Sequence, residues 1–177
     1  MRLNLSSLKT SRPGLSAEYG AMMAQAAAVC LQDQGHSSGV AMQANGLGAR
    51  AYALEWSPVS EDTFPTWADE PFATEQGAYA IAILLLEQVF NLIPIERSRK
   101  GTGFDYWLGQ LDAKGQATGF FQRKARLEVS GIRRGSRRQI AQRLRRKLKQ
   151  VQKSHRSLPG YAVIVEFGEP FATVGSR

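Results

Sequence analysis

Apolar and polar residues alternate along the chain with two periods, one typical of helices and one typical of strands. Residues 72–91 are apolar nearly all the way round a helix, which indicates burial on more than one side. In the second half of residues 120–132, apolar and polar residues instead alternate one by one, which predicts a strand. Residues 136–154 carry one narrow apolar stripe, which predicts an amphipathic helix that packs on a sheet. The stripe consists of Ile140, Leu144, Leu148 and Val151.

These patterns and the turn residues between them predict an α/β fold in a single domain, residues 1–177. The expected elements, in chain order, are a helix (16–34), a hairpin of two short strands (38–57), an acidic loop with three prolines (58–71), a helix (72–91), three strands (92–98, 103–111 and 120–132), a basic helix (136–154) and a last strand (160–168). Residues 72–168 form the expected core. Residues 1–71 add an N-terminal helix and a β-hairpin to it.

Composition narrows the functional class only slightly. The one cysteine, Cys30, excludes an intrachain disulfide and a cysteine-ligated metal site, so we expect a cytoplasmic protein. The first residues lack the apolar run of a signal peptide, and the longest apolar stretch, residues 78–86, is too short to span a bilayer. We therefore expect no membrane association.

The positive charge is concentrated in one segment. The net charge is +8, and residues 133–156 carry eleven of the 23 Lys and Arg residues without any acid. Such a segment favours a polyanion, and a membrane surface is the least favoured candidate because the stripe lacks aromatic anchors. We expect nucleic acid, DNA rather than RNA. The expected binding residues are Arg133, Arg134, Arg137, Arg138, Arg145, Arg146 and Lys149.

Two acidic residues lie on strands that we expect to be neighbours. Strand alternation places Leu127 and Val129 on one face of residues 120–132, and Glu128 on the other. The residues that share the second face are Lys124, Arg126, Glu128 and Ser130. In the stretch GTGFDYWLG, Asp105 shares a face with Trp107, and the opposite face holds Phe104, Tyr106 and Leu108. If the apolar faces align, Asp105 and Glu128 lie on the same side of the sheet.

Two interpretations of this acidic pair stay open. Two neighbouring carboxylates repel each other unless a cation neutralises them, and a hard divalent cation such as Mg²⁺ or Mn²⁺ would do so. Alternatively, Asp105 accepts hydrogen bonds from the backbone at the GTG turn. Glu128 would then pair with Arg126 or with an arginine of the following helix.

The element order and these residues resemble the PD-(D/E)XK restriction-endonuclease-like superfamily. Its core runs helix, three strands, helix, strand, as expected here for residues 72–168. Its motif places an Asp on one strand and Glu or Asp, any residue and Lys on the next. Asp105 matches the Asp, and Glu128-Val129-Ser130 matches the rest except that Ser130 stands in place of the Lys.

The resemblance implies a site for Mg²⁺ or Mn²⁺ held by Asp105 and Glu128, with help from Glu75 on the first core helix. It also implies hydrolysis of a phosphodiester by a metal-activated water. The family's Lys assists that water or steadies the developing charge. Ser130 cannot act as a cation, so Lys124 on the same strand face is the candidate substitute. Arg126 is nearer but is a poor proton acceptor.

Two functions therefore follow from the sequence. The first is a nucleic-acid-acting protein with a nuclease-like core, a metal-dependent phosphodiesterase with weak or lost activity in the isolated chain. The second is a non-catalytic scaffold subunit that docks its basic helix on nucleic acid or an acidic protein partner within a larger complex. By analogy with the superfamily, either function fits bacterial or phage genome defence or a mobile element.

Overall fold

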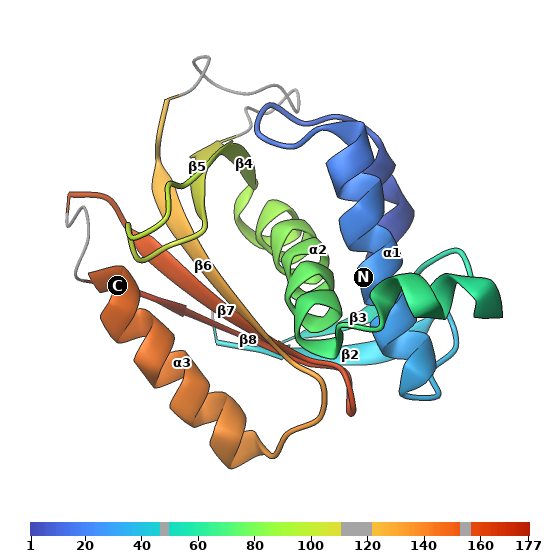
Figure 1. Cartoon of the computed structure of the whole chain (residues 1–177). Helices are drawn as coiled ribbons and strands as arrows, with labels where there is room; N and C mark the ends of the chain where they lie inside the picture. The colour runs from blue at the N-terminus through green and yellow to red at the C-terminus, as the bar shows by residue number, and fades with distance from the viewer. Residues whose placement is uncertain (47–49, 111–121, 153–156) are drawn as a thin grey trace.

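The computed structural model describes residues 1–46, 50–110, 122–152 and 157–177 (Figure 1). Its helices are α1 (Ala17–Asp33), α2 (Glu70–Phe90) and α3 (Arg137–Gln152), with two 3₁₀ helices, η1 (Leu5–Lys9) and η2 (Glu61–Trp67). Its strands are β1 (Arg2–Asn4), β2 (Val40–Asn45), β3 (Arg50–Glu55), β4 (Leu92–Arg97), β5 (Tyr106–Gln110), β6 (Ala125–Ile132), β7 (Gly160–Glu166) and β8 (Phe171–Ser176). The fold is mixed α/β, as the sequence predicts.

All of these strands belong to one mixed sheet in the order β1-β3-β2-β8-β7-β6-β5-β4. Strands β4, β5 and β6 form an antiparallel meander, and α3 carries the chain over to β7, which runs parallel to β6. Strand β8 returns antiparallel to β7 and pairs in parallel with β2. The predicted N-terminal hairpin, β2 and β3, therefore continues the same sheet.

The helices cover opposite faces of the sheet (Figure 1). Helix α2 lies on one face with α1 packed against it, and α3 lies on the other face. The main core forms between α1, α2 and the sheet, and it includes Leu127 and Val129 of β6. On the opposite face Ile140 of α3 packs on Ile164 and Phe171. The two faces of β6 are thus buried by different helices.

Local sequence signals set the helix ends. The Ser16 hydroxyl accepts a hydrogen bond from the Tyr19 amide (3.2 Å), which makes it the N-cap of α1. The Asp69 carboxylate caps α2 in the same way by accepting from the Phe72 amide (3.1 Å). Asn91 ends α2 in the left-handed region at φ 54°, a conformation that asparagine tolerates better than most residues. Helix α2 extends two residues further towards the N-terminus than the apolar pattern predicts.

Several expectations about the strands were wrong in detail. Residues 103–105 precede β5, so the strict alternation begins only at Tyr106. Phe104 consequently packs edge-on against Trp107, at 4.6 Å between ring centroids, instead of sharing the face of Tyr106. Lys124 likewise precedes β6, which begins at Ala125. Strands β1 and β8 were not predicted, because short segments without clear alternation carry a weak signal.

No helix in the described ranges is long and apolar enough to cross a membrane.

Candidate functional site

Asp105, Glu128 and Glu75 line one cavity of about 460 Å³. They come from three elements: the segment before β5, the middle of β6 and the first turns of α2. The other charged residues of its wall are basic, namely Arg97, Arg99, Lys100 and Lys147. The fold therefore gathers the three acidic residues that the resemblance singles out into a basic surrounding.

Asp105 lies where β5 separates from β6. Its amide still donates to the Leu127 carbonyl (2.7 Å), but the next ladder position is taken by its side chain. The Asp105 Oδ2 atom accepts from the Val129 amide (2.8 Å). The carboxylate thus takes the place of the backbone carbonyl that would accept this bond if β5 continued alongside β6. This bond fixes the carboxylate beside β6. The backbone donor is Val129 and not the GTG turn expected from the sequence.

Glu128 is only 3% exposed and lies under α3. Its Oε1 atom accepts hydrogen bonds from the Lys147 ammonium and from the Gln150 amide (3.1 Å to Gln150 Nε2). Burial, followed by the charge of Asp105, raises the pKa of Glu128 to about 7 although Lys147 acts in the opposite direction. Each interpretation of the sequence is thus correct in part. The carboxylates of Asp105 and Glu128 lie close together, and Glu128 also pairs with a cation of the following helix.

Tyr79 connects the two remaining carboxylates. Its hydroxyl oxygen lies 2.8 Å from Asp105 Oδ1 and 3.0 Å from Glu75 Oε1, so its one proton can serve either acceptor. Burial, followed by the charge of Asp105, raises the pKa of Tyr79 well above its usual value, so the hydroxyl remains a donor. The Arg97 guanidinium lies 4.8 Å from the Tyr79 ring centroid and donates to its oxygen (3.3 Å). Sequence reasoning missed Tyr79, although Glu75 and Tyr79 have the spacing of neighbours on a helix face.

The candidate cations on β6 lie elsewhere. Lys124 is not among the described residues that line the cavity. Arg126 is 2% exposed and donates to the backbone carbonyls of Val151 in the last turn of α3 (2.6 Å) and of Leu158 just before β7 (2.5 Å). It fastens the helix to the sheet and does not pair with Glu128. The cation at the site is Lys147, and its signal in the sequence was hidden among the many bases of α3.

Ser130 lies two residues beyond Glu128 on the same face of β6. Its hydroxyl accepts from the Arg143 guanidinium (2.9 Å). The position of the motif Lys is therefore occupied by a serine that an arginine of α3 contacts. Arg143 and Lys147 are four residues apart, so they lie one helical turn apart on the face of α3 that meets β6.

Of the seven basic residues predicted to bind nucleic acid, four line one hollow and three lie outside its lining. Arg134, Arg145, Arg146 and Lys149 line a polar hollow of about 720 Å³ beside α3. Arg133 pairs with Asp33 (3.1 Å), and the Arg137 guanidinium lies 3.7 Å from the Phe171 ring centroid. Arg138 is exposed on α3. Two of the seven side chains, Arg133 and Arg137, thus contact other side chains of the protein, and binding of nucleic acid by this set stays a prediction.

The described residues hold no group of three or more His, Cys, Asp or Glu side chains placed to share a metal ion. The donor set that does converge is the pair Asp105 and Glu128. One or two carboxylates are what proteins supply to Mg²⁺ when substrate phosphates and water complete its coordination. The pair therefore fits a divalent cation that arrives with a phosphate ligand, and not a structural cation held by protein groups alone.

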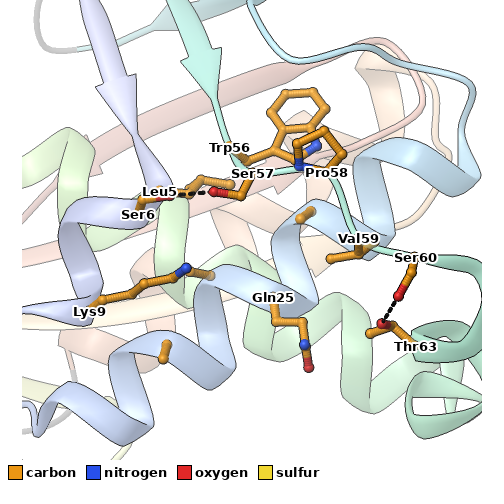
Figure 2. A pocket seen from close by; sticks show the side chains of 13 residues that line it. Leu5, Ser6, Lys9, Gln25, Trp56, Ser57, Pro58, Val59, Ser60 and Thr63 are labelled. Atoms are coloured by element: carbon orange, nitrogen blue, oxygen red, sulfur yellow. Dashed lines mark hydrogen bonds between the residues drawn. The ribbon is translucent and has the colours of Figure 1, made fainter.

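A second cavity of about 400 Å³ lies between η1, α1 and residues 56–63 (Figure 2). Small alanines of α1, Trp56 and Val59 form much of its wall. Its hydroxyl groups are engaged in pairs, Ser6 with Ser57 and Ser60 with Thr63, both at 3.3 Å (Figure 2). Lys9 is its only titratable side chain among the described residues. Among the described residues that line it there is no carboxylate, histidine or cysteine.

Comparison with known proteins adds no relative: no protein-family model, no curated protein and no solved structure matches the chain.

Proposed function

We propose that this protein is a divalent-metal-dependent phosphodiesterase that acts on nucleic acid. The observation that carries the proposal is the meeting of Asp105, Glu128 and Lys147 in one cavity with a basic rim. Burial of Glu128 beside a second carboxylate raises its pKa to about 7, which means that its ionised form lowers the stability of the fold. Perturbed groups of this kind gather at functional sites more often than elsewhere.

The resemblance to the PD-(D/E)XK superfamily supports the same function. The chain order α2, β4, β5, β6, α3, β7 is the order of that core. Asp105 and Glu128 are the two residues that match the motif, and they line the same cavity. The departure at Ser130 is offset by Lys147, which reaches Glu128 from α3 and can take the part assigned to the motif Lys.

Each residue then has a defined part. Asp105 and Glu128 would hold Mg²⁺ or Mn²⁺, which polarises the phosphate and lowers the pKa of a bound water when it is present. The Val129 amide and the Tyr79 hydroxyl hold the Asp105 carboxylate in place. Lys147 would move from Glu128 towards the phosphate and stabilise the charge that develops there. Arg97, Arg99 and Lys100 attract the polyanion to the rim.

The test combines metal binding with cleavage. Calorimetric titration of Mn²⁺ into the wild-type chain should give specific binding that Asp105→Ala/Glu128→Ala loses. Plasmid DNA incubated in the same buffer should be nicked only with metal, and Lys147→Gln should lower the rate about a hundredfold or more. The matched control is Lys149→Gln, an exposed lysine on the same helix, which should lower the affinity for DNA most at low salt without a comparable loss of rate.

Absence of both metal binding and cleavage, with DNA and RNA substrates alike, would overturn the proposal. Salt-dependent nucleic-acid binding without metal binding would instead favour the scaffold subunit. In that case the Lys147–Glu128 pair serves to hold α3 on the sheet.

A further inference from the structure

A second polar pair lies next to the carboxylate pair. Side chains of β6 and α3 face each other in two steps: Glu128 meets Lys147, and Ser130 meets Arg143. The Arg143 Nη1 atom donates to the Ser130 hydroxyl oxygen at 2.9 Å. A hydroxyl that accepts from an arginine keeps its own proton free to donate. This pair therefore offers donors from two sides to a single acceptor.

The charge of Arg143 is unmatched. In the described part of the chain, no carboxylate lies within ion-pairing distance of its guanidinium. Arg143 is partly buried, and burial, followed by the nearby Arg146, lowers its pKa. A guanidinium nevertheless stays charged in proteins, so a partly buried one without an acid is an anion-binding group.

A cavity of about 430 Å³ opens onto this pair. It shares Glu75 and Lys147 with the cavity of the carboxylate pair, and it shares Ile132 and Arg143 with the basic hollow beside α3. Its wall also contains Arg133 from the end of β6 and Glu70 from the start of α2. The three hollows are thus neighbours that share these wall residues, and together they are called the groove.

We propose that Ser130 and Arg143 bind the phosphate next to the one that reacts in the bound nucleic-acid strand. The inference rests on the proposed function and adds to it a binding site for a neighbouring phosphate of the substrate. Two residues along a strand span roughly 7 Å, which is comparable with the spacing of successive phosphates along a nucleic-acid backbone. The site therefore selects a polynucleotide strand, with phosphates on both sides of the reacting one, over a nucleotide monoester.

The test measures binding without cleavage. A fluorescein-labelled DNA duplex is titrated in Ca²⁺ buffer and followed by anisotropy, and single phosphates are replaced in turn by neutral methylphosphonates. Arg143→Gln should weaken binding of the unmodified duplex roughly tenfold to a hundredfold. With a methylphosphonate at one particular position, the affinity of the wild type for the duplex should fall by the same factor. The affinity of Arg143→Gln should not fall further with that substitution. Ser130→Ala should show a smaller loss at the same position.

The matched control is Arg138→Gln, an exposed arginine of α3 outside the lining of the groove. Like the wild type, Arg138→Gln should lose affinity when the phosphate at that one position is replaced by a methylphosphonate. Additive losses at every position in Arg143→Gln would overturn the subsite, even if the wild type cleaves DNA. The position-specific coupling without any cleavage would support the subsite while the catalytic proposal fails. Absence of duplex binding by the wild type would overturn both.

Discussion

Replacing Glu128 by glutamine should change how the stability of the fold depends on pH. The substitution keeps the shape of the side chain and keeps an oxygen that can accept from Lys147 and Gln150. It removes the proton that the carboxyl exchanges. Because Glu128 is 3% exposed, its ionised form is the costly one, and glutamine avoids that cost.

The magnitude follows from the pKa shift. Burial, followed by Asp105, raises the pKa of Glu128 from 4.5 to about 7. Between these values the folded chain keeps a proton that the unfolded chain has released, so the free energy of unfolding falls as the pH rises. The favourable contribution is complete below the unfolded pKa and is lost as the pH passes the folded pKa. The loss between about pH 5 and about pH 8 amounts to about 2–3 kcal/mol at roughly 1.4 kcal/mol per pKa unit.

Urea denaturation followed by tryptophan fluorescence measures this directly, because the three tryptophans are each 6% exposed in the folded chain. The free energy of unfolding of Glu128→Gln minus that of the wild type should increase by about 2–3 kcal/mol from about pH 5 to about pH 8. The control is Glu96→Gln, which removes an exposed carboxylate paired with Arg123 at 2.7 Å and should change stability by less than about 1 kcal/mol. A difference between Glu128→Gln and wild type that stays constant over this range would refute the reasoning. It would mean that Lys147 fully offsets the burial of the charge.

Three further outcomes are expected. Arg126→Met should lower the free energy of unfolding by about 2–4 kcal/mol in urea, because the backbone carbonyls of Val151 and Leu158 lose a charged donor; an unchanged midpoint would contradict this role. Gly131→Ala should cost about 1–3 kcal/mol in the same assay, since the added Cβ would overlap the Thr74 carbonyl oxygen of α2. The affinity for Mn²⁺, measured by calorimetry, should rise about tenfold per pH unit and level off above the raised pKa of Glu128, because the ligand must lose its proton. A flat profile would exclude Glu128 as a ligand.

The sequence predicted the elements that carry strong periodic signals. The helix expected at 136–154 is α3, and its stripe is buried at both ends, at Ile140 and Val151. The strand expected at 160–168 is β7, since a continuous apolar run between glycines is typical of a buried strand. Strand β8 was not predicted because the segment FATVGS is short and is recognisable as a strand only through its pairing with β7 and β2.

The candidate site could be predicted only for its strand residues. Glu128 lies on β6 and Asp105 directly before the neighbouring strand β5, so the order of the strands brings them close together, while the hydrogen bond from the Val129 amide fixes the Asp105 carboxylate. Lys147 could not be chosen among the bases of α3, because the rotation of the helix on the sheet is set by packing. The face it presents depends on Ile140 and Val151 meeting the sheet, and no pattern in the sequence pairs particular α3 residues with Glu128 or Ser130. The last residue of the predicted strand 103–111 and the first two of the predicted strand 120–132 lie outside the described residues.

The position of β8 has a consequence for synthesis of the protein. It follows every other element in the sequence, yet it lies inside the sheet between β2 and β7. Among the described strands, it alone joins β1, β2 and β3 to β4, β5, β6 and β7 by hydrogen bonds. While the chain emerges from the ribosome, β2 and β7 therefore wait as unpaired edges, which are the surfaces most prone to pair with other chains. This sheet closes only after residue 176 has been added, and the closing step pairs segments far apart in the chain.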